Sequence, residues 1–161
     1  MGVARTLIII IAAVLTLLGT WVFALFPFIF GTLGSGLGFA MNLPVIITAT
    51  PTADVVVVFY LLLVLFIAWL ASGVLQLIGL KSRIVGIIFS LIPLAIGLMF
   101  VLLVYTEVLG DMSLVFFFMT VADPISEFFP MYIELGDMGL GVYLLLAGGV
   151  LGVIGSSLPK E

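Results

Sequence analysis

The residues of this chain that could carry out chemistry are few, and most of them are acidic. The 161 residues include eight Asp and Glu, four Lys and Arg, and no His or Cys. The absence of His and Cys excludes thiolate chemistry, disulfides, haem ligation through His and the usual zinc sites. Six of the eight acids fall in one segment of the sequence: Glu107, Asp111, Asp123, Glu127, Glu134 and Asp137.

Four of these acids form pairs at helical spacing, Glu107 with Asp111 and Asp123 with Glu127. Such a pair could bind a divalent cation, but two carboxylates make a weak, oxygen-only site. The alternative, which we favour, is that the carboxylates keep an apolar, Phe-rich segment solvated at the membrane surface. A membrane hydrolase or transferase would need a His, a Cys or clustered acids. We therefore predict that the chain is not an enzyme and has no metal site or cofactor.

Polar side chains are rare in the long apolar segments. No ionisable residue lies in their cores, which argues against an ion-coupled transporter or pump. Gln76 is the only amide there, and we expect it to hydrogen-bond to a neighbouring helix rather than to bind a ligand. Small or polar residues recur at every fourth position in two stripes: Ala68, Ser72 and Gln76, and Gly148, Gly152 and Ser156. Packing within one chain is the simpler interpretation of both, and the second stripe is the candidate for a contact between chains.

Four apolar segments must position these residues. Sixty-five per cent of the chain is apolar and its mean hydropathy is +1.58, more than a soluble domain of this length can bury. As helices, the segments are long enough to cross a hydrocarbon layer of roughly 30 Å. We predict an all-α integral membrane protein, a four-transmembrane-helix bundle in a single domain (1–161), with spans at about 6–26, 55–80, 84–105 and 138–158.

Two details of these spans carry their own expectations. The first apolar run exceeds the roughly 7–15 residues of a signal peptide's apolar region, so we expect a retained helix. Pro93 should kink the third span, and Ser90 is close enough to bond the carbonyl that the proline frees.

The segments 27–54 and 106–137 are predicted to connect the spans without crossing the membrane. The first is rich in Gly and Pro, which predicts a loop with turns that lies among lipid headgroups or packs on the protein. It lacks the Lys of a phosphate-binding loop, which argues against a nucleotide site. The second has an apolar stretch, 114–120, that is too short to cross and is predicted to lie at the interface. Asp123 and Pro124 are predicted to begin a helix.

The charges are distributed asymmetrically over four alternating spans. All basic residues, Arg5, Lys81, Arg83 and Lys160, fall on one side, and seven of the eight acids fall on the other. The positive-inside rule therefore predicts a cell-membrane protein with both termini in the cytoplasm and both long connections outside. The net charge of −4 argues against a nucleic-acid partner, which would require a basic face.

The sequence also contains a candidate internal repeat. Residues 71–79 and 147–155 are identical at six of nine positions, at an offset of 76 residues. A weaker match relates Arg5 to Arg83 and Gly19 to Gly97, at an offset of 78. A duplicated helical hairpin would leave nearly equal offsets and parallel repeats. Chance similarity between apolar segments is the alternative, and the sequence leaves both open.

Two functions fit this pattern. The leading hypothesis is a non-enzymatic tetraspan protein that acts as a structural, scaffold or accessory subunit. It would associate laterally in the lipid, as a homo-oligomer or with other membrane proteins, through its helices. The alternative is an oligomeric pore or facilitative channel or carrier, whose acidic outer vestibule would favour cations.

Overall fold

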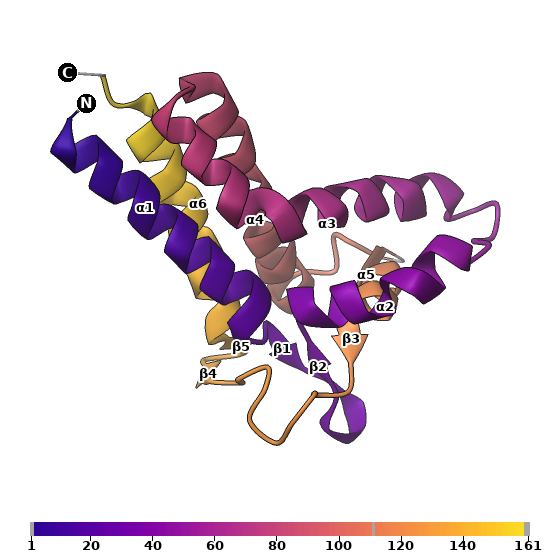
Figure 1. Cartoon of the computed structure of the whole chain (residues 1–161). Helices are drawn as coiled ribbons and strands as arrows, with labels where there is room; N and C mark the ends of the chain where they lie inside the picture. Colours follow the sequence, from indigo (N-terminus) through magenta and orange to yellow (C-terminus); the bar gives the residue numbers. More distant parts are fainter. Residues whose placement is uncertain (1, 111, 160–161) are drawn as a thin grey trace.

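The computed structural model describes residues 2–110 and 112–159, and long helices dominate it (Figure 1). These are α1 (Val3–Leu17), continued by η1 (Leu18–Val22); α3 (Val56–Gln76), continued by η3 (Leu77–Leu80); α4 (Arg83–Tyr105); and α6 (Leu140–Ser157). All four are long and apolar enough to cross a membrane. They confirm the four predicted helices. The predicted and observed boundaries differ most at the end of the first helix, which was predicted at residue 26 and is observed at Val22.

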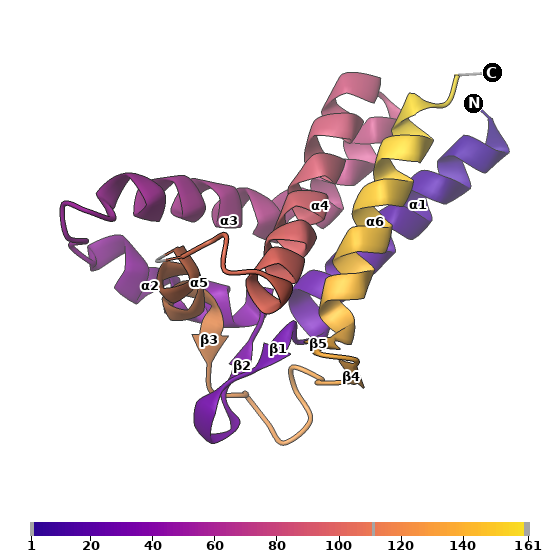
Figure 2. The same cartoon turned by 180° about the vertical axis from the view of Figure 1, so that it is seen from behind.

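The four helices pack side by side in a ring, in the order α1, α6, α4 and α3. Helix α6 contacts both α1 and α4, and α3 contacts the same two helices (Figures 1 and 2). The two ends of the described chain meet, because Gly2 and Pro159 line one small pocket. The α3–α4 turn lies at this same end, where Arg5 of α1 bonds to Gly79 and Leu80. We call this the terminal end of the molecule.

A second group of helices projects sideways from this core. It consists of α2 (Gly36–Thr48), α5 (Met112–Thr120) and the first half of α3, which pack together. Figures 1 and 2 show this group extending away from α1, α4 and α6. We call it the lateral arm. Its presence makes the molecule wider than four helices packed side by side.

Short strands close the end opposite the termini. β1 (Phe26–Pro27), β2 (Leu33–Gly34) and β3 (Val121–Ala122) form an antiparallel sheet in that order, with η2 (Ile29–Gly31) between the first two. Phe26 pairs with Gly34, and Leu33 pairs with Ala122. β4 (Glu134–Leu135) and β5 (Met138–Gly139) form a separate hairpin before α6. The sheet ties the segment before α2 to the segment after α5.

Helix α2 corrects the expectation that 27–54 is a loop. Its N-terminus is capped by Ser35, whose Oγ accepts a hydrogen bond of 2.9 Å from the Gly38 N–H. Its glycines allow close packing rather than a turn, since a β-carbon on Gly36 would lie 2.5 Å from the Thr20 carbonyl oxygen. Burial of Phe39 and Ile46 outweighs the poor helix propensity of Gly and Pro. Of the two expected positions for this segment, among lipid headgroups or packed on the protein, the structure shows the second.

Two smaller expectations are also wrong. No helix starts at Asp123: the N–H groups of Ile125 and Ser126 both donate to the Phe129 carbonyl, at 2.9 and 3.2 Å, in a tight turn. Phe129 precedes a proline, which disfavours helical backbone there. In α4, which continues through Pro93, the Ser90 hydroxyl donates to the Gly86 carbonyl at 2.7 Å and not to the carbonyl that Pro93 frees.

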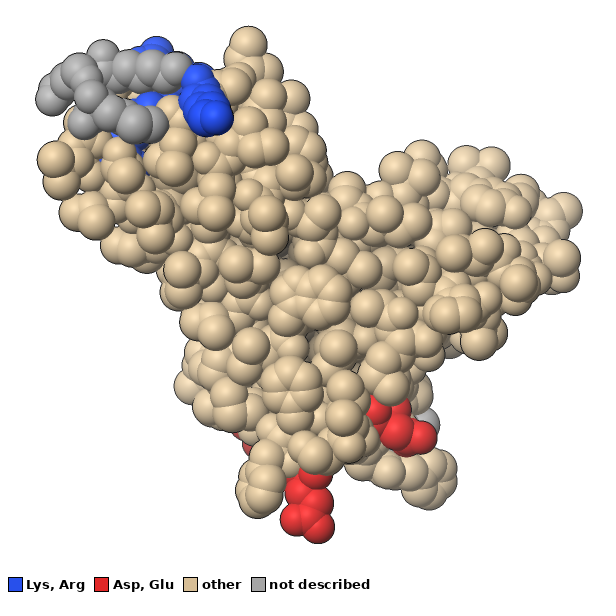
Figure 3. Space-filling model, viewed as in Figure 1, with Lys and Arg blue, Asp and Glu red and all other residues tan. Residues whose placement is uncertain are grey.

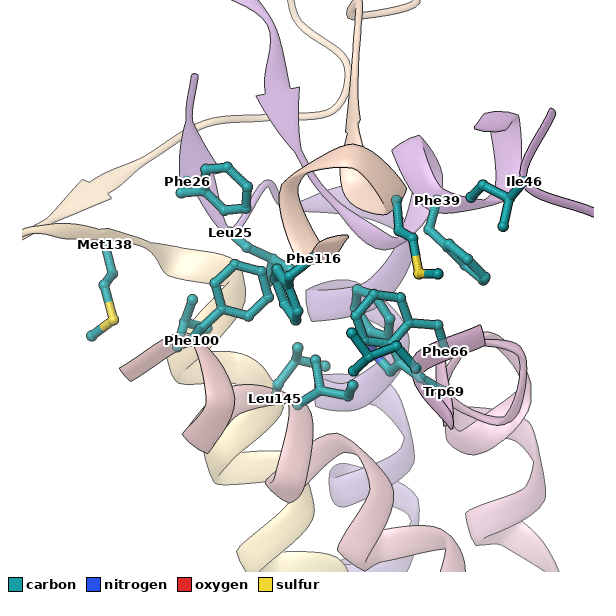
Figure 4. Packing of buried hydrophobic residues seen from close by; sticks show 14 of the residues in the cluster. Leu25, Phe26, Phe39, Ile46, Phe66, Trp69, Phe100, Phe116, Met138 and Leu145 are labelled. Atoms are coloured by element: carbon teal, nitrogen blue, oxygen red, sulfur yellow. The ribbon is translucent and has the colours of Figure 1, made fainter. Parts of the chain in front are cut away.

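Aromatic side chains join the lateral arm to the long helices (Figure 4). Phe116 of α5 packs edge-on against Phe100 of α4 and Phe66 of α3, with ring centroids 4.3 and 5.0 Å apart. Phe66 also contacts Phe39 of α2 at 5.3 Å and Trp69 at 5.7 Å. Edge-to-face contacts of this kind add about 0.5–1.5 kcal/mol each to the burial of the rings. These rings fix the arm to the core.

Two close contacts in the structure join residues that are equivalent in the candidate internal repeat. A β-carbon on Gly79 would lie 2.9 Å from the Cα of Gly86, and one on Gly155 would lie 2.9 Å from the Cγ2 of Ile8. Gly155 is equivalent to Gly79 at the offset of 76 residues, and Gly86 is equivalent to Ile8 at the offset of 78. Two halves related by a rotation axis would exchange contacts in this way. The duplication stays a prediction, now with a structural counterpart.

Candidate functional site

The side chains buried between the four long helices differ in size and polarity from one end of the molecule to the other. Toward the sheet it holds large apolar side chains, and toward the terminal end it holds small and polar ones. On α3, Phe66 and Trp69 precede Ser72 and Gln76 on the buried face. We call the polar half the polar column, which consists of Thr16, Ser72, Gln76, Ser90 and Ser156, all at most 1% exposed.

The glycine stripe of α6 forms one wall of the polar column. A β-carbon on Gly148 would lie 2.5 Å from the Thr16 Oγ1, and one on Gly152 would overlap the Ser90 Oγ. The Ser156 hydroxyl contacts Gly79, at 2.9 Å from a β-carbon built there. The stripe of Gly148, Gly152 and Ser156 thus faces α1, α3 and α4 of its own chain. Being buried, it offers no surface to a second chain in this conformation.

The other predicted stripe, on α3, contributes two of its three residues to the polar column. Ser72 and Gln76 are buried in the polar column, whereas Ala68 is only half-buried. The Ser72 hydroxyl donates to the Trp69 carbonyl of its own helix at 2.8 Å. The cross-helix hydrogen bond expected of Gln76 is not formed: neither its Oε1 nor its Nε2 has a partner. Its Nε2 lies 3.3 Å from the position of a β-carbon on Gly152.

Further buried polar atoms of this region also lack partners. Among the described residues these include Thr16 Oγ1, Ser156 Oγ and Trp69 Nε1. A buried polar group without a hydrogen bond costs about 1–3 kcal/mol. Amides and hydroxyls do not titrate near neutral pH, so the column can donate and accept hydrogen bonds but supplies no acid or base. Toward the sheet, the large side chains on the buried faces of α3 and α4 include the rings of Phe66, Trp69 and Phe100.

Of the four predicted topology anchors, Arg5 differs most from expectation. Its side chain is 1% exposed and donates to the Gly79 and Leu80 carbonyls at 2.5 and 3.3 Å. Lys81 and Arg83 are exposed, and Lys160 lies outside the described residues. The basic side chains visible in Figure 3 lie at the terminal end, and the visible acidic ones lie at the opposite end.

The acidic residues remain at the surface. Glu107, Asp123, Glu127, Glu134 and Asp137 are exposed, and Asp111 lies outside the described residues. The described part of the chain contains no group of three or more acids that could hold a metal ion. Since Asp123 and Glu127 lie on a turn, they do not share the helix face that their spacing suggested. Nearby, burial and the Glu134 carboxylate raise the pKa of the Tyr132 phenol above its ordinary value.

The lateral arm carries a feature that the sequence did not reveal. Two apolar grooves, of about 450 and 470 Å³, flank α5. The first lies against α2 at Val45, and the second lies against the α2–α3 connection at Thr52. Leu114 and Phe118 line both grooves and are 69% and 53% exposed. The run of Phe residues in α5 was the available signal, but it did not show which rings would stay exposed.

No protein-family model matches the chain, and no curated protein or solved structure is significantly similar to it. A function therefore has to be inferred from the surfaces and the interior described above. The polar column and the lateral arm are the two features that distinguish the molecule from a plain set of packed apolar helices.

Proposed function

We propose that this chain is a non-enzymatic membrane protein that acts as a structural or accessory subunit through lateral association. The observation that carries the proposal is the lateral arm. Its exposed side chains include Val57, Leu61 and Val64 on α3 as well as Leu114 and Phe118 on α5, each at least 53% exposed. The face of the arm seen in Figure 3 shows no charged side chain.

The position of the arm supports this use. It branches from α3, one of the helices long enough to cross a membrane, at a level between the basic and the acidic end of the molecule (Figures 1 and 3). Within lipid, helices associate through close packing rather than through the hydrophobic effect. Grooves on both sides of the exposed Leu114 and Phe118 give a partner helix a surface on which its side chains can interlock.

We further propose that the terminal end faces the cytoplasm of a cell membrane. The described basic residues, Arg5, Lys81 and Arg83, all belong to that end, and the described acids of the 106–137 segment belong to the other connections. Cytoplasmic loops carry an excess of Lys and Arg. The alternative is an oligomeric pore, in which several chains would together line a polar path past the aromatic side chains.

Site-directed cross-linking tests the proposed association. Because the chain has no Cys, Leu114→Cys and Phe118→Cys would each carry a single photo-reactive maleimide. Val14 of α1 lies outside the arm and is 48% exposed, so Val14→Cys is the matched control. We expect cross-linked products, with a second copy or another membrane protein, from the arm positions but not from Val14→Cys. A strict monomer in nanodiscs, together with no arm product in native membranes, would refute the proposal.

A further inference from the structure

Phe30 occupies a strained and fully exposed position at the tip of the β1–β2 hairpin. Its φ angle is +57°, and Gly31 after it has a φ angle of +81°. A β-carbon makes a positive φ angle unfavourable, so hairpin positions of this kind favour Asn, Asp or Gly. Because Phe30 is fully exposed, contacts of its ring within the chain do not compensate for this strain. Strained residues of this kind cluster at functional sites.

A second exposed ring lies on the segment that follows β3. Ser126 and Phe129 pair across a tight turn, in which the Phe129 N–H donates to the Ser126 carbonyl at 3.2 Å. Phe128 lies within this turn and is 79% exposed. Large apolar side chains that are exposed together on one surface mark contact sites for partners. Two turns of this molecule therefore each present a Phe ring that the fold itself does not use.

A pocket lies between these two segments, at the end of the molecule opposite the termini (Figures 1 and 2). It has a volume of about 370 Å³. Its lining includes Gly31 and Leu33 from the hairpin, and Glu127, Phe128 and Tyr132 from the segment after β3. Most of the lining residues are apolar, with one carboxylate and one phenol among them. Such a composition suits an apolar side chain that a few polar groups orient.

The charges around this pocket are acidic. Besides Glu127 in its lining, Asp123 and Glu134 are exposed at the two ends of the same segment. The described basic residues belong to the terminal end, where Figure 3 shows those that are visible. Carboxylates beside the exposed rings disfavour burial of this surface in the hydrocarbon layer. They favour a partner that carries Lys or Arg, whose cations are also attracted to aromatic faces.

We infer that this surface binds a basic segment of a partner protein, in the aqueous compartment at the end opposite the termini. A large apolar side chain of that segment packs against Phe30 and Phe128 and enters the pocket, and a neighbouring Lys or Arg pairs with Glu127. The pocket shares no residue with the grooves beside α5. The inference is therefore independent of the lateral association proposed above.

Selection of peptides by the full chain in phosphatidylcholine nanodiscs tests this surface. The probe is a library of random nine-residue peptides displayed on phage, depleted beforehand on empty nanodiscs. We expect the enriched peptides to combine a large apolar residue with a neighbouring Lys or Arg. Enrichment of peptides without this combination, or no enrichment, would overturn the inference. The dissociation constant of the most enriched peptide is then measured by fluorescence anisotropy.

Phe30→Asn separates binding from folding. It should weaken binding of this peptide about tenfold or more, because the aromatic ring no longer packs on the bound side chain. The same change should raise the midpoint of thermal unfolding by about 2–4 °C, because Asn tolerates a positive φ angle better than Phe does. Leu135→Asn, at a 43% exposed position outside the pocket, is the control and should retain binding without a gain in stability.

Glu127→Gln tests the acidic side of the pocket. It should weaken binding about two- to fivefold at low salt, as expected for an exposed ion pair, and the difference should disappear at high salt. Glu107→Gln removes the same charge from an exposed position on another connection and should retain binding. Wild-type affinity in Phe30→Asn, or equal losses in the two Glu variants, would overturn the docking surface.

A fluorophore at the hairpin tip distinguishes a protein partner from the membrane. Phe30→Cys, in a chain that has no other Cys, would carry an environment-sensitive dye. In nanodiscs we expect emission typical of water and no quenching by nitroxide-labelled lipid. Emission typical of hydrocarbon, together with quenching by the labelled lipid, would show that the tip enters the membrane and would overturn the inference.

Discussion

Close contacts between single residues hold the polar half of the interior together. Gly152 of α6 lies where the Ser90 hydroxyl and the Gln76 amide converge, and the absence of a side chain allows three helices to meet there. In lipid, helices pack most tightly where small residues let their backbones approach. In the same place the Gln76 amide has no hydrogen-bond partner.

The first prediction belongs to this contact. Gly152→Leu should destabilise the chain by about 1–3 kcal/mol or more, because the new side chain would overlap Ser90 and force α4 away from α6. The control is Ala147→Leu, one residue before the stripe on the exposed face of the same helix, which should be nearly neutral. Thermal unfolding in detergent measures both. Equal midpoints for the two variants would show that α6 does not face α4 as described.

At the scale of elements, α5 depends on its neighbours. It has nine residues, and isolated helices shorter than about 12–15 residues are marginal. Phe116 anchors it in the aromatic cluster, and Asn42 of α2 fixes its end, with Nδ2 donating to the carbonyls of Val121 and Met119 at 2.8 and 3.3 Å. Helix α5 is therefore held by the buried side chains of its second half, Phe116, Met119 and Thr120, and by Asn42.

Loss of the Asn42 amide should loosen this end of the arm. Asn42→Leu leaves two partly buried carbonyls without their donor, at a cost of about 1–3 kcal/mol. Amide hydrogen exchange in residues 112–122 should then accelerate about tenfold, since 1.4 kcal/mol corresponds to that factor. Exchange in α1 and α6 should not change. Met41→Leu, at an exposed neighbouring position, is the control, and unchanged exchange in both variants would contradict this role of Asn42.

At the scale of the whole molecule, charge separates along one direction. The basic side chains visible in Figure 3 lie where the described chain begins and ends, and the visible acidic ones lie at the opposite end. Asp54 differs, because it lies on the α2–α3 connection at the tip of the lateral arm (Figure 1). The separation arises from the number of long helices: with four of them, both ends of the chain return to one side. The orientation proposed above depends on this arrangement.

Single-Cys labelling checks that orientation. Ser82→Cys marks the α3–α4 turn and Ser126→Cys marks the exposed turn after β3, in a chain that has no other Cys. In intact cells, a membrane-impermeant maleimide should label Ser126→Cys and should reach Ser82→Cys only after permeabilisation. The reverse pattern would place the termini outside.

Much of the architecture was predictable because it depends on local composition. Uninterrupted apolar length specifies a spanning helix, since in lipid every backbone hydrogen bond must be made internally. The four helices and the short polar turn at Ser82 follow from this rule. Helix α2 did not, because its Gly and Pro residues disfavour helix in isolation, and only packing of Phe39 and Ile46 compensates.

The candidate sites divide in the same way. The sequence by itself determined which residues are small or polar within the spans, and so it made Gln76, Gly148 and Gly152 candidates for contacts between helices or between chains. It could not determine which face of each helix turns inward, because these helices are apolar on nearly every face and lipid accepts any of them. Only the tertiary structure decided that Arg5 is buried, since its partners Gly79 and Leu80 lie 74 and 75 residues away. Contacts over that distance are made by folding and leave no local pattern in the sequence.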